Sequence, residues 1–92
     1  MKLFWTPTAR ENRKEIRRYI AADNRKAASN MDQLFSKAAS RLIDHPKMGR
    51  SGRLTNTREL VVHRNYILIY DITDDTLRIL RVMHVARQWP PT

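Results

Sequence analysis

Histidine is the residue type in this chain best suited to proton transfer, because imidazole changes its charge near neutral pH. The chain contains three histidines, His45, His63 and His84. His84 lies late in an alternating segment, where it can act as a general acid or base or form a structural hydrogen bond at a strand end. The spacing of the three matches no metal-ligand motif, so we expect neither a metal site nor a cofactor.

Arginines are the residues suited to holding a phosphate, since a guanidinium presents a planar fork of donors. Arg50, Arg53 and Arg58 flank a predicted loop that contains the two glycines of the chain. A second group of cations runs from Arg10 to Arg18. Such a run is usually a solvated helix face, although it can also form a surface for a partner or a target.

The composition limits the class of protein. The chain has 92 residues, 18 Lys plus Arg against 9 Asp plus Glu, a net charge of +9 and no cysteine. This length fits one domain over residues 1–92, and the charge favours nucleic acid or an acidic protein as partner. Disulfides, thiolate catalysis and Cys-based zinc sites are excluded. Without an apolar run of about 18–20 residues or a signal-peptide pattern, we expect a cytoplasmic protein with no membrane contact.

Two helices are predicted in the first half of the chain. Thr8 and Glu11 match a capping box, which predicts a helix that begins at Thr8 and reaches about Ala22. Asp23-Asn24 offers the N-cap of a second amphipathic helix that ends near Asp44, and the short link favours an antiparallel hairpin. The apolar stripe of the first helix consists of Ala9, Ile16, Tyr19 and Ile20.

The second half alternates with a period of two, which predicts strands over residues 58–63, 65–73 and 76–85 after a loop over 47–53. In the middle strand, one face is expected to pack on the helices; it carries Tyr66, Leu68, Tyr70 and Ile72. Strict alternation places Arg78 and Arg81 on opposite faces of the last strand. With an extended segment at Leu3–Thr6, the order β-α-α-β-β-β implies an α+β domain, in which the hairpin packs on one face of an antiparallel meander.

This order of elements resembles the RelE/ParE toxin superfamily, and three motifs carry the resemblance. The first is Asp44–Pro46 at the end of a helix, followed by Gly49-Arg50. The second is Thr57–Val61 followed by Asn65–Tyr70. The third is Val82–Pro90, whose Ala86-Arg87-Gln88-Trp89 portion is similar to the tail of the ParE-like branch.

The resemblance implies the toxin of a bacterial type II toxin–antitoxin module, which inhibits growth when free and is neutralised by its cognate antitoxin. Antitoxins of this superfamily wrap around the toxin, and the complex often represses its own operon through antitoxin contacts with operator DNA. We expect the antitoxin on the first helix, at Ile16, Tyr19 and Ile20. A basic toxin suits an acidic antitoxin segment, because complementary potentials speed association.

The resemblance offers two targets. ParE-type members poison DNA gyrase, whereas RelE-type members cut mRNA on the ribosome with a base, an acid and phosphate-binding cations. At three positions where RelE-type members carry a cation, this chain has Arg58, which keeps the charge, and Leu60 and Ile67, which do not. These two losses favour gyrase and leave the ribosome-dependent endoribonuclease as the alternative. A toxin that has lost its activity and only regulates its operon is a third possibility.

If the chain is a ribonuclease, its reduced catalytic set is His84, Arg58 and Arg87. Four residues of the second half are expected to contact the target or nucleic acid. They are Arg50, Arg53, Arg81 and Trp89. Among them, the indole of Trp89 could stack on a base.

Overall fold

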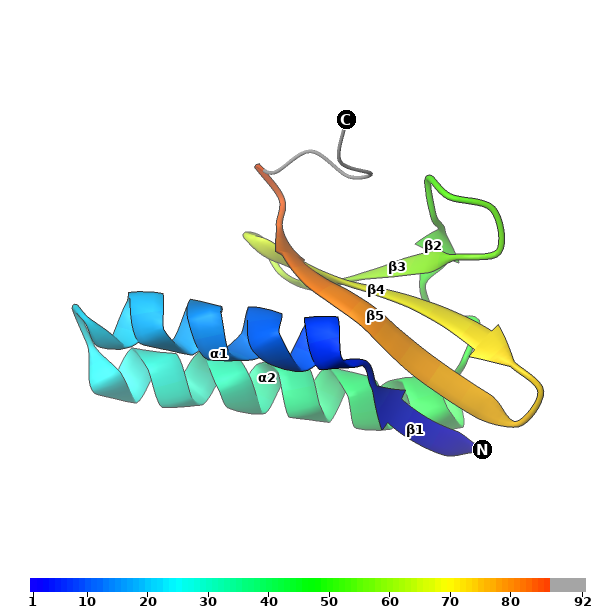
Figure 1. Cartoon of the computed structure of the whole chain (residues 1–92), viewed down its shortest axis with the longest axis horizontal. Coiled ribbons are helices and arrows are strands. Elements are labelled where there is room, and N and C mark those ends of the chain that lie inside the picture. Colours follow the sequence, from blue (N-terminus) through cyan, green and yellow to red (C-terminus); the bar gives the residue numbers. More distant parts are fainter. Residues whose placement is uncertain (87–92) are drawn as a thin grey trace.

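The computed structural model describes residues 1–86, which form a layer of two helices and a layer of strands (Figure 1). The helices are α1 (Pro7–Ala21) and α2 (Arg25–Asp44). The strands are β1 (Lys2–Trp5), β2 (Arg50–Ser51), β3 (Arg58–His63), β4 (Tyr66–Thr73) and β5 (Thr76–His84). The predicted α+β architecture, with a helical hairpin on one face of a sheet, is confirmed. Neither helix combines the length and the apolar character needed to cross a bilayer.

The sheet is mixed, with the strand order β1-β5-β4-β3-β2. The meander of β3, β4 and β5 is antiparallel as predicted, but β1 joins its edge parallel to β5, with Lys2 opposite Thr76. β2 lies inside the predicted loop and pairs Arg50 with Glu59. Two residues are too few to show a period in the sequence, so alternation could not reveal β2.

The start of α1 differs from the predicted capping box at Thr8. The N-cap is Thr6, whose extended backbone (φ −63°, ψ 158°) lets Oγ1 accept a hydrogen bond from the Ala9 amide at 3.1 Å. Pro7 then occupies the first helical position, where its fixed φ suits the helix and its missing N–H has no cost. The second cap is as predicted, because Asn24 Oδ1 accepts from the Ala27 amide at 3.0 Å.

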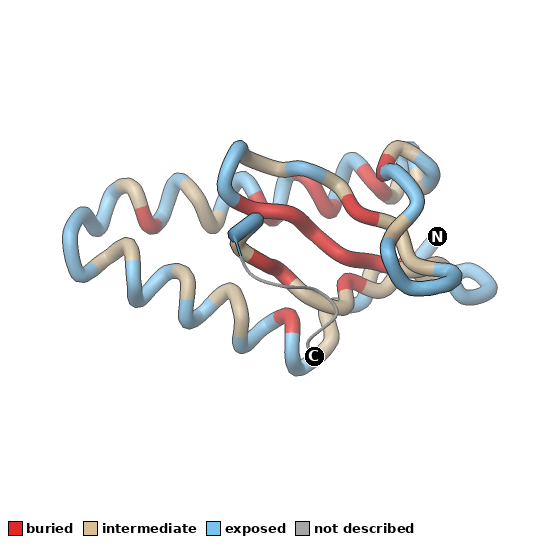
Figure 2. Tube along the Cα trace, turned by 90° about the horizontal axis from the view of Figure 1, so that it is seen from above, coloured by how far each residue is buried: buried red, intermediate tan, exposed pale blue. Residues whose placement is uncertain are grey.

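The core lies between the two layers, where buried positions follow the central strands and the inner sides of the helices (Figure 2). Tyr66 packs edge-to-face on Phe35, with ring centroids 5.7 Å apart. The predicted inward face of β4 is therefore confirmed. The predicted stripe of α1 is wrong at Tyr19, which is 80% exposed, because this side chain extends past the edge of the core.

A bulge in β5 changes which side chains share a face. Ile69 pairs with Arg81, but the next residue, Tyr70, pairs with Ile79, so one residue of β5 is left over. The shift reverses the alternation beyond it. Arg78, opposite Asp71, and Arg81 therefore lie on the same face, away from the helices, and the prediction of opposite faces is wrong.

Candidate functional site

Arg58 lies at one end of β3, where its guanidinium binds main-chain oxygens of the preceding loop. Nη1 donates to the carbonyl of Gly49 at 2.8 Å and to that of Lys47 at 3.4 Å. On β4, Arg58 is paired with Tyr70, which lies on the helix side of the sheet. The arrangement fixes the loop between α2 and β2 and uses Nη1, one of the three guanidinium nitrogens that could bind a phosphate.

The Tyr70 hydroxyl completes this contact between strand and loop. It donates to the Pro46 carbonyl at 2.7 Å and accepts from the Gly49 amide at 3.0 Å. A methyl group at Gly49 would lie 2.6 Å from the hydroxyl oxygen, so the close approach requires glycine. Burial raises the pKa of Tyr70, while the Gly49 hydrogen bond and the charge of Arg58 lower it by less.

His84 lies at the opposite end of the meander. It is paired with Tyr66, and the two rings meet edge-to-face with centroids 5.3 Å apart. Its Nδ1 accepts a hydrogen bond from the Ala86 amide at 3.1 Å. The imidazole therefore faces the helix side of the sheet, and one of its nitrogens is used by the chain itself.

The structure does not bring Arg58 and His84 together. Their partners on β4, Tyr70 and Tyr66, are four residues apart, which is roughly 13 Å along a strand. A general acid and a phosphate-binding cation must both reach one phosphodiester, which requires hydrogen-bond distances. The third predicted member, Arg87, lies outside the described residues, as does Trp89.

Glu59 organises the loop between β2 and β3, a role that the sequence analysis missed. Its side chain is only 2% exposed, and its carboxylate accepts from Arg50 Nη2 and from the Arg53 amide, each at 3.3 Å. The Arg53 side chain also approaches it, with Nε at 3.9 Å. A buried carboxylate needs such partners, because an unpaired charge away from water is costly. The nearby arginines were the only signal for it in the sequence.

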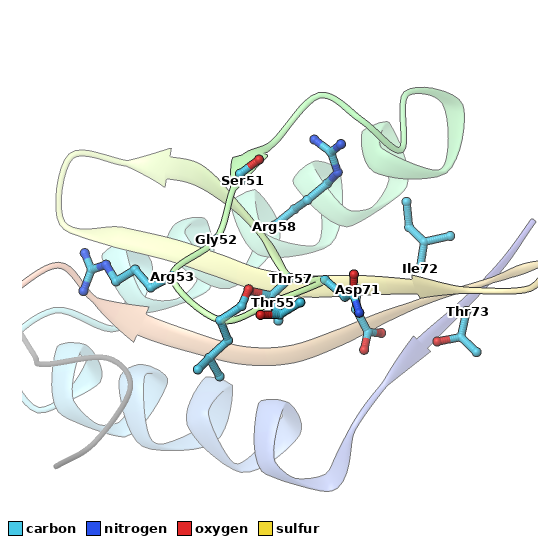
Figure 3. A pocket seen from close by; sticks show the side chains of 11 residues that line it. Ser51, Gly52, Arg53, Thr55, Thr57, Arg58, Asp71, Ile72 and Thr73 are labelled. Carbon is cyan, nitrogen blue, oxygen red and sulfur yellow. The ribbon is translucent and has the colours of Figure 1, made fainter.

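A polar cavity of about 730 Å³ lies beside this loop and is lined in part by Arg53, Arg58 and Asp71. Figure 3 shows the two arginine side chains extending away from each other. Asp71 is held by Arg78, with Nη2 to Oδ2 at 2.6 Å. The three arginines predicted to grip a phosphate do not converge on one point, because Arg50 and Arg53 are drawn to Glu59 while Arg58 binds the loop carbonyls.

A second concavity, of about 710 Å³, lies between α1 and the end of the sheet where His84 is found. We call it the α1 groove. Its apolar lining includes Ile16 and Ile20, with Tyr19 exposed beside them. The three residues predicted to bind an antitoxin therefore line one groove. The sequence could not show that His84 joins them, because this depends on how α1 packs on β5.

A polar contact joins the two layers in the lining of the α1 groove. Asn12 Oδ1 accepts a hydrogen bond from the Val82 amide of β5 at 3.1 Å.

Among residues 1–86, no cluster of histidine and acidic side chains has the geometry to hold a metal ion.

Comparison with known proteins places this geometry in a family. Residues 3–89 match the model of the ParE toxin of the type II toxin–antitoxin system, parDE. The chain is 39% identical over 90 residues to Y4kP of Sinorhizobium fredii, a protein assigned as a toxin, with 97% of this chain and 93% of that protein covered. It is 35% identical to toxin RelE2 of Caulobacter vibrioides, with 94% and 97% covered.

The fold is also that of a solved structure. The chromosomal ParDE toxin–antitoxin system from P. aeruginosa contains a chain that superposes with a TM-score of 0.81 at 21% identity, with 92% of this chain and 96% of that chain covered. The chain therefore belongs to the ParE toxin family of type II toxin–antitoxin systems, within the RelE/ParE superfamily.

Proposed function

We propose that this toxin inhibits growth by acting on DNA gyrase in the cytoplasm and is held inactive by its cognate antitoxin. The observation that supports a gyrase target over mRNA cleavage is the separation of Arg58 from His84. Arg58 is also bound to loop carbonyls at 2.8 and 3.4 Å. Among the described residues, Arg58 and His84 are therefore too far apart to act as a phosphate-binding cation and an acid or base on the same phosphodiester.

The two positions that lack the RelE-type cations support the same proposal. Ile67 is 4% exposed and packs with Ile69 and Met83 on the face away from the helices. Leu60 is partly buried against the main core. Both side chains contribute apolar packing, and a cation at either position would have to be buried or force a rearrangement.

A histidine substitution tests the proposal in cells. His84→Ala is expected to leave growth inhibition intact when the toxin is expressed without antitoxin. His63→Ala is a matched control, because His63 Nδ1 also accepts from the amide two residues later, Asn65, at 3.2 Å. Loss of toxicity in His84→Ala alone, with an unchanged melting temperature, would favour the ribonuclease.

We also propose that the α1 groove receives an apolar segment of the antitoxin. Tyr19 is 80% exposed beside the apolar side chains of Ile16 and Ile20. An exposed aromatic residue beside a groove that is partly lined by apolar side chains is typical of a binding hot spot. The charge of +9 would favour approach of an acidic chain.

Affinity measurements test this docking site. Tyr19→Ala is expected to weaken antitoxin binding by about thirtyfold or more, because central aromatic residues often contribute about 2 kcal/mol or more. Val61→Ala is the control, since Val61 is 54% exposed on a different element, β3. Equal affinities for the two variants would show that the antitoxin binds elsewhere.

A further inference from the structure

The outer side of the helical hairpin, away from the sheet, carries a row of cations. Arg10, Lys14, Arg17 and Arg18 are spaced so that a period of 3.6 places them on one side of α1, and all four are exposed. They cover about 12 Å of the helix axis at 1.5 Å per residue. The opposite side of α1 contributes Ala9 and packs Ile16 on the core.

These cations continue into a groove between the two helices. The groove, of about 530 Å³, is lined by Arg17, Arg18 and Arg25, with Ala21 and Ala28 among the small residues between them. We call it the hairpin groove. Small side chains at its base let a ligand approach closely between three guanidinium groups.

The carboxylate that lines the hairpin groove is already engaged. Asp32 accepts from Arg13 Nε and Nη2, each at 2.9 Å, while its contact with Arg17 Nη1 is longer, at 3.5 Å. Arg13 also lies 4.4 Å above the Trp5 ring, which fixes it between the layers. The charge of Asp32 is therefore largely offset by Arg13, and the groove keeps a positive balance.

The other acidic groups of the hairpin are absent from the lining of the hairpin groove. Glu15 lines the α1 groove, and Glu11 is one helical turn before it. Asp23 lines a cavity with Tyr19 and Ile20. Among residues 1–86, Asp32 is therefore the one carboxylate in the lining of the hairpin groove, against three arginines.

We propose that the hairpin groove binds the phosphate backbone of duplex DNA. A guanidinium matches a phosphate in charge and in geometry. The lining contains no aromatic ring, whereas sites for single strands usually rely on stacking platforms. The only side-chain amide in the lining is Gln33, so the contacts would not depend on base sequence. This inference does not depend on which target the toxin has.

The test is fluorescence anisotropy of antitoxin-free protein with a labelled DNA duplex over a range of salt concentrations. The variant carries Arg17→Gln, Arg18→Gln and Arg25→Gln. We expect the slope of log K against log salt to fall by roughly 2–3, and Kd at low salt to rise at least about tenfold. A double variant that keeps Arg17 leaves its contact with Asp32 intact and is expected to show an intermediate loss.

The control variant removes the same charge at three exposed positions on other elements: Lys2→Gln, Lys47→Gln and Arg64→Gln. Equal losses in the control and in the hairpin variant would overturn the proposal, because net charge alone would then explain binding. Tighter binding of a duplex RNA of the same sequence would overturn the choice of DNA. Unchanged DNA binding with weakened antitoxin binding would assign the groove to the protein partner instead.

Discussion

At the scale of single residues, Thr6 connects the start of α1 with the bulge of β5. Its Oγ1 accepts from the Ala9 amide and donates to the Leu80 carbonyl at 3.0 Å. Thr6→Ala is expected to lower the free energy of unfolding by about 1–2 kcal/mol in urea denaturation. Thr8→Ala removes the hydroxyl that the sequence suggested as the cap and should cost less than about 0.5 kcal/mol. The reverse order of effects would contradict the cap assignment.

Tyr70 is a second residue whose polar atom stabilises the fold. Tyr70→Phe keeps the ring but leaves the Pro46 carbonyl and the Gly49 amide without their partner. We expect a loss of about 1–3 kcal/mol in the free energy of unfolding, because buried polar groups become unsatisfied. A neutral substitution would show that water replaces the hydroxyl at both sites.

The raised pKa of Tyr70 predicts a dependence on alkaline pH. Burial favours the neutral phenol in the folded state, so the unfolded chain ionises first as pH rises through its ordinary value of about 10. The stability contributed by Tyr70 is therefore present below that pH and is lost above it. Denaturation at about pH 8 and about pH 11 should show the stability difference between wild type and Tyr70→Phe shrinking. A constant difference would mean that the phenol titrates alike in both states.

At the scale of elements, the loop between β2 and β3 depends on Glu59. Glu59→Gln removes the charge that holds Arg50 and the Arg53 amide. We expect faster trypsin cleavage after Arg53 and a loss of about 1–3 kcal/mol in stability. Asp32→Asn is the control, since it breaks an ion pair of the helical hairpin and should leave that cleavage rate unchanged. Equal cleavage rates in the Glu59 variant and wild type would contradict this role.

The elements differ in how far the sequence could predict them. Periodicity predicted both helices and the meander, and Asn24 was correctly predicted to cap α2, because these signals are local. The cap of α1 was placed two residues too late, at Thr8 in place of Thr6. The bulge in β5 could not be predicted, since its Leu80 carbonyl binds Thr6, 74 residues away in the chain. The parallel pairing of β1 with β5 is equally remote, because Lys2 lies opposite Thr76.

In the candidate sites too, the features set by local sequence were predictable, and those set by contacts between distant residues were not. The helical period correctly predicted that Ile16 and Ile20 lie together on one side of α1. His84 lines the same groove because α1 packs on β5, which the sequence could not show. The arginines of the loop, Arg50 and Arg53, were predicted to bind a phosphate from their charge alone. Their directions depend on Glu59, whose burial cannot be read from one sequence.

At the scale of the whole molecule, the α1 groove proposed for the antitoxin shares no described lining residue with the cavity beside Arg53, one of the residues expected to contact the target. Tyr19→Ala should therefore inhibit growth as strongly as wild type when expressed alone, yet require more antitoxin for rescue. Titration of antitoxin expression against growth measures this difference. Loss of toxicity in the folded variant would mean that the α1 groove also binds the target.

The central claim, a gyrase target, is tested most directly by a paired assay on one antitoxin-free preparation. One arm measures plasmid supercoiling by purified gyrase, and the other maps message ends by primer extension in a translating extract. The proposed gyrase target predicts inhibited supercoiling, and the separation of Arg58 from His84 predicts that the message stays intact. Ribosome-dependent cuts with normal supercoiling would contradict the claim and identify the protein as an endoribonuclease.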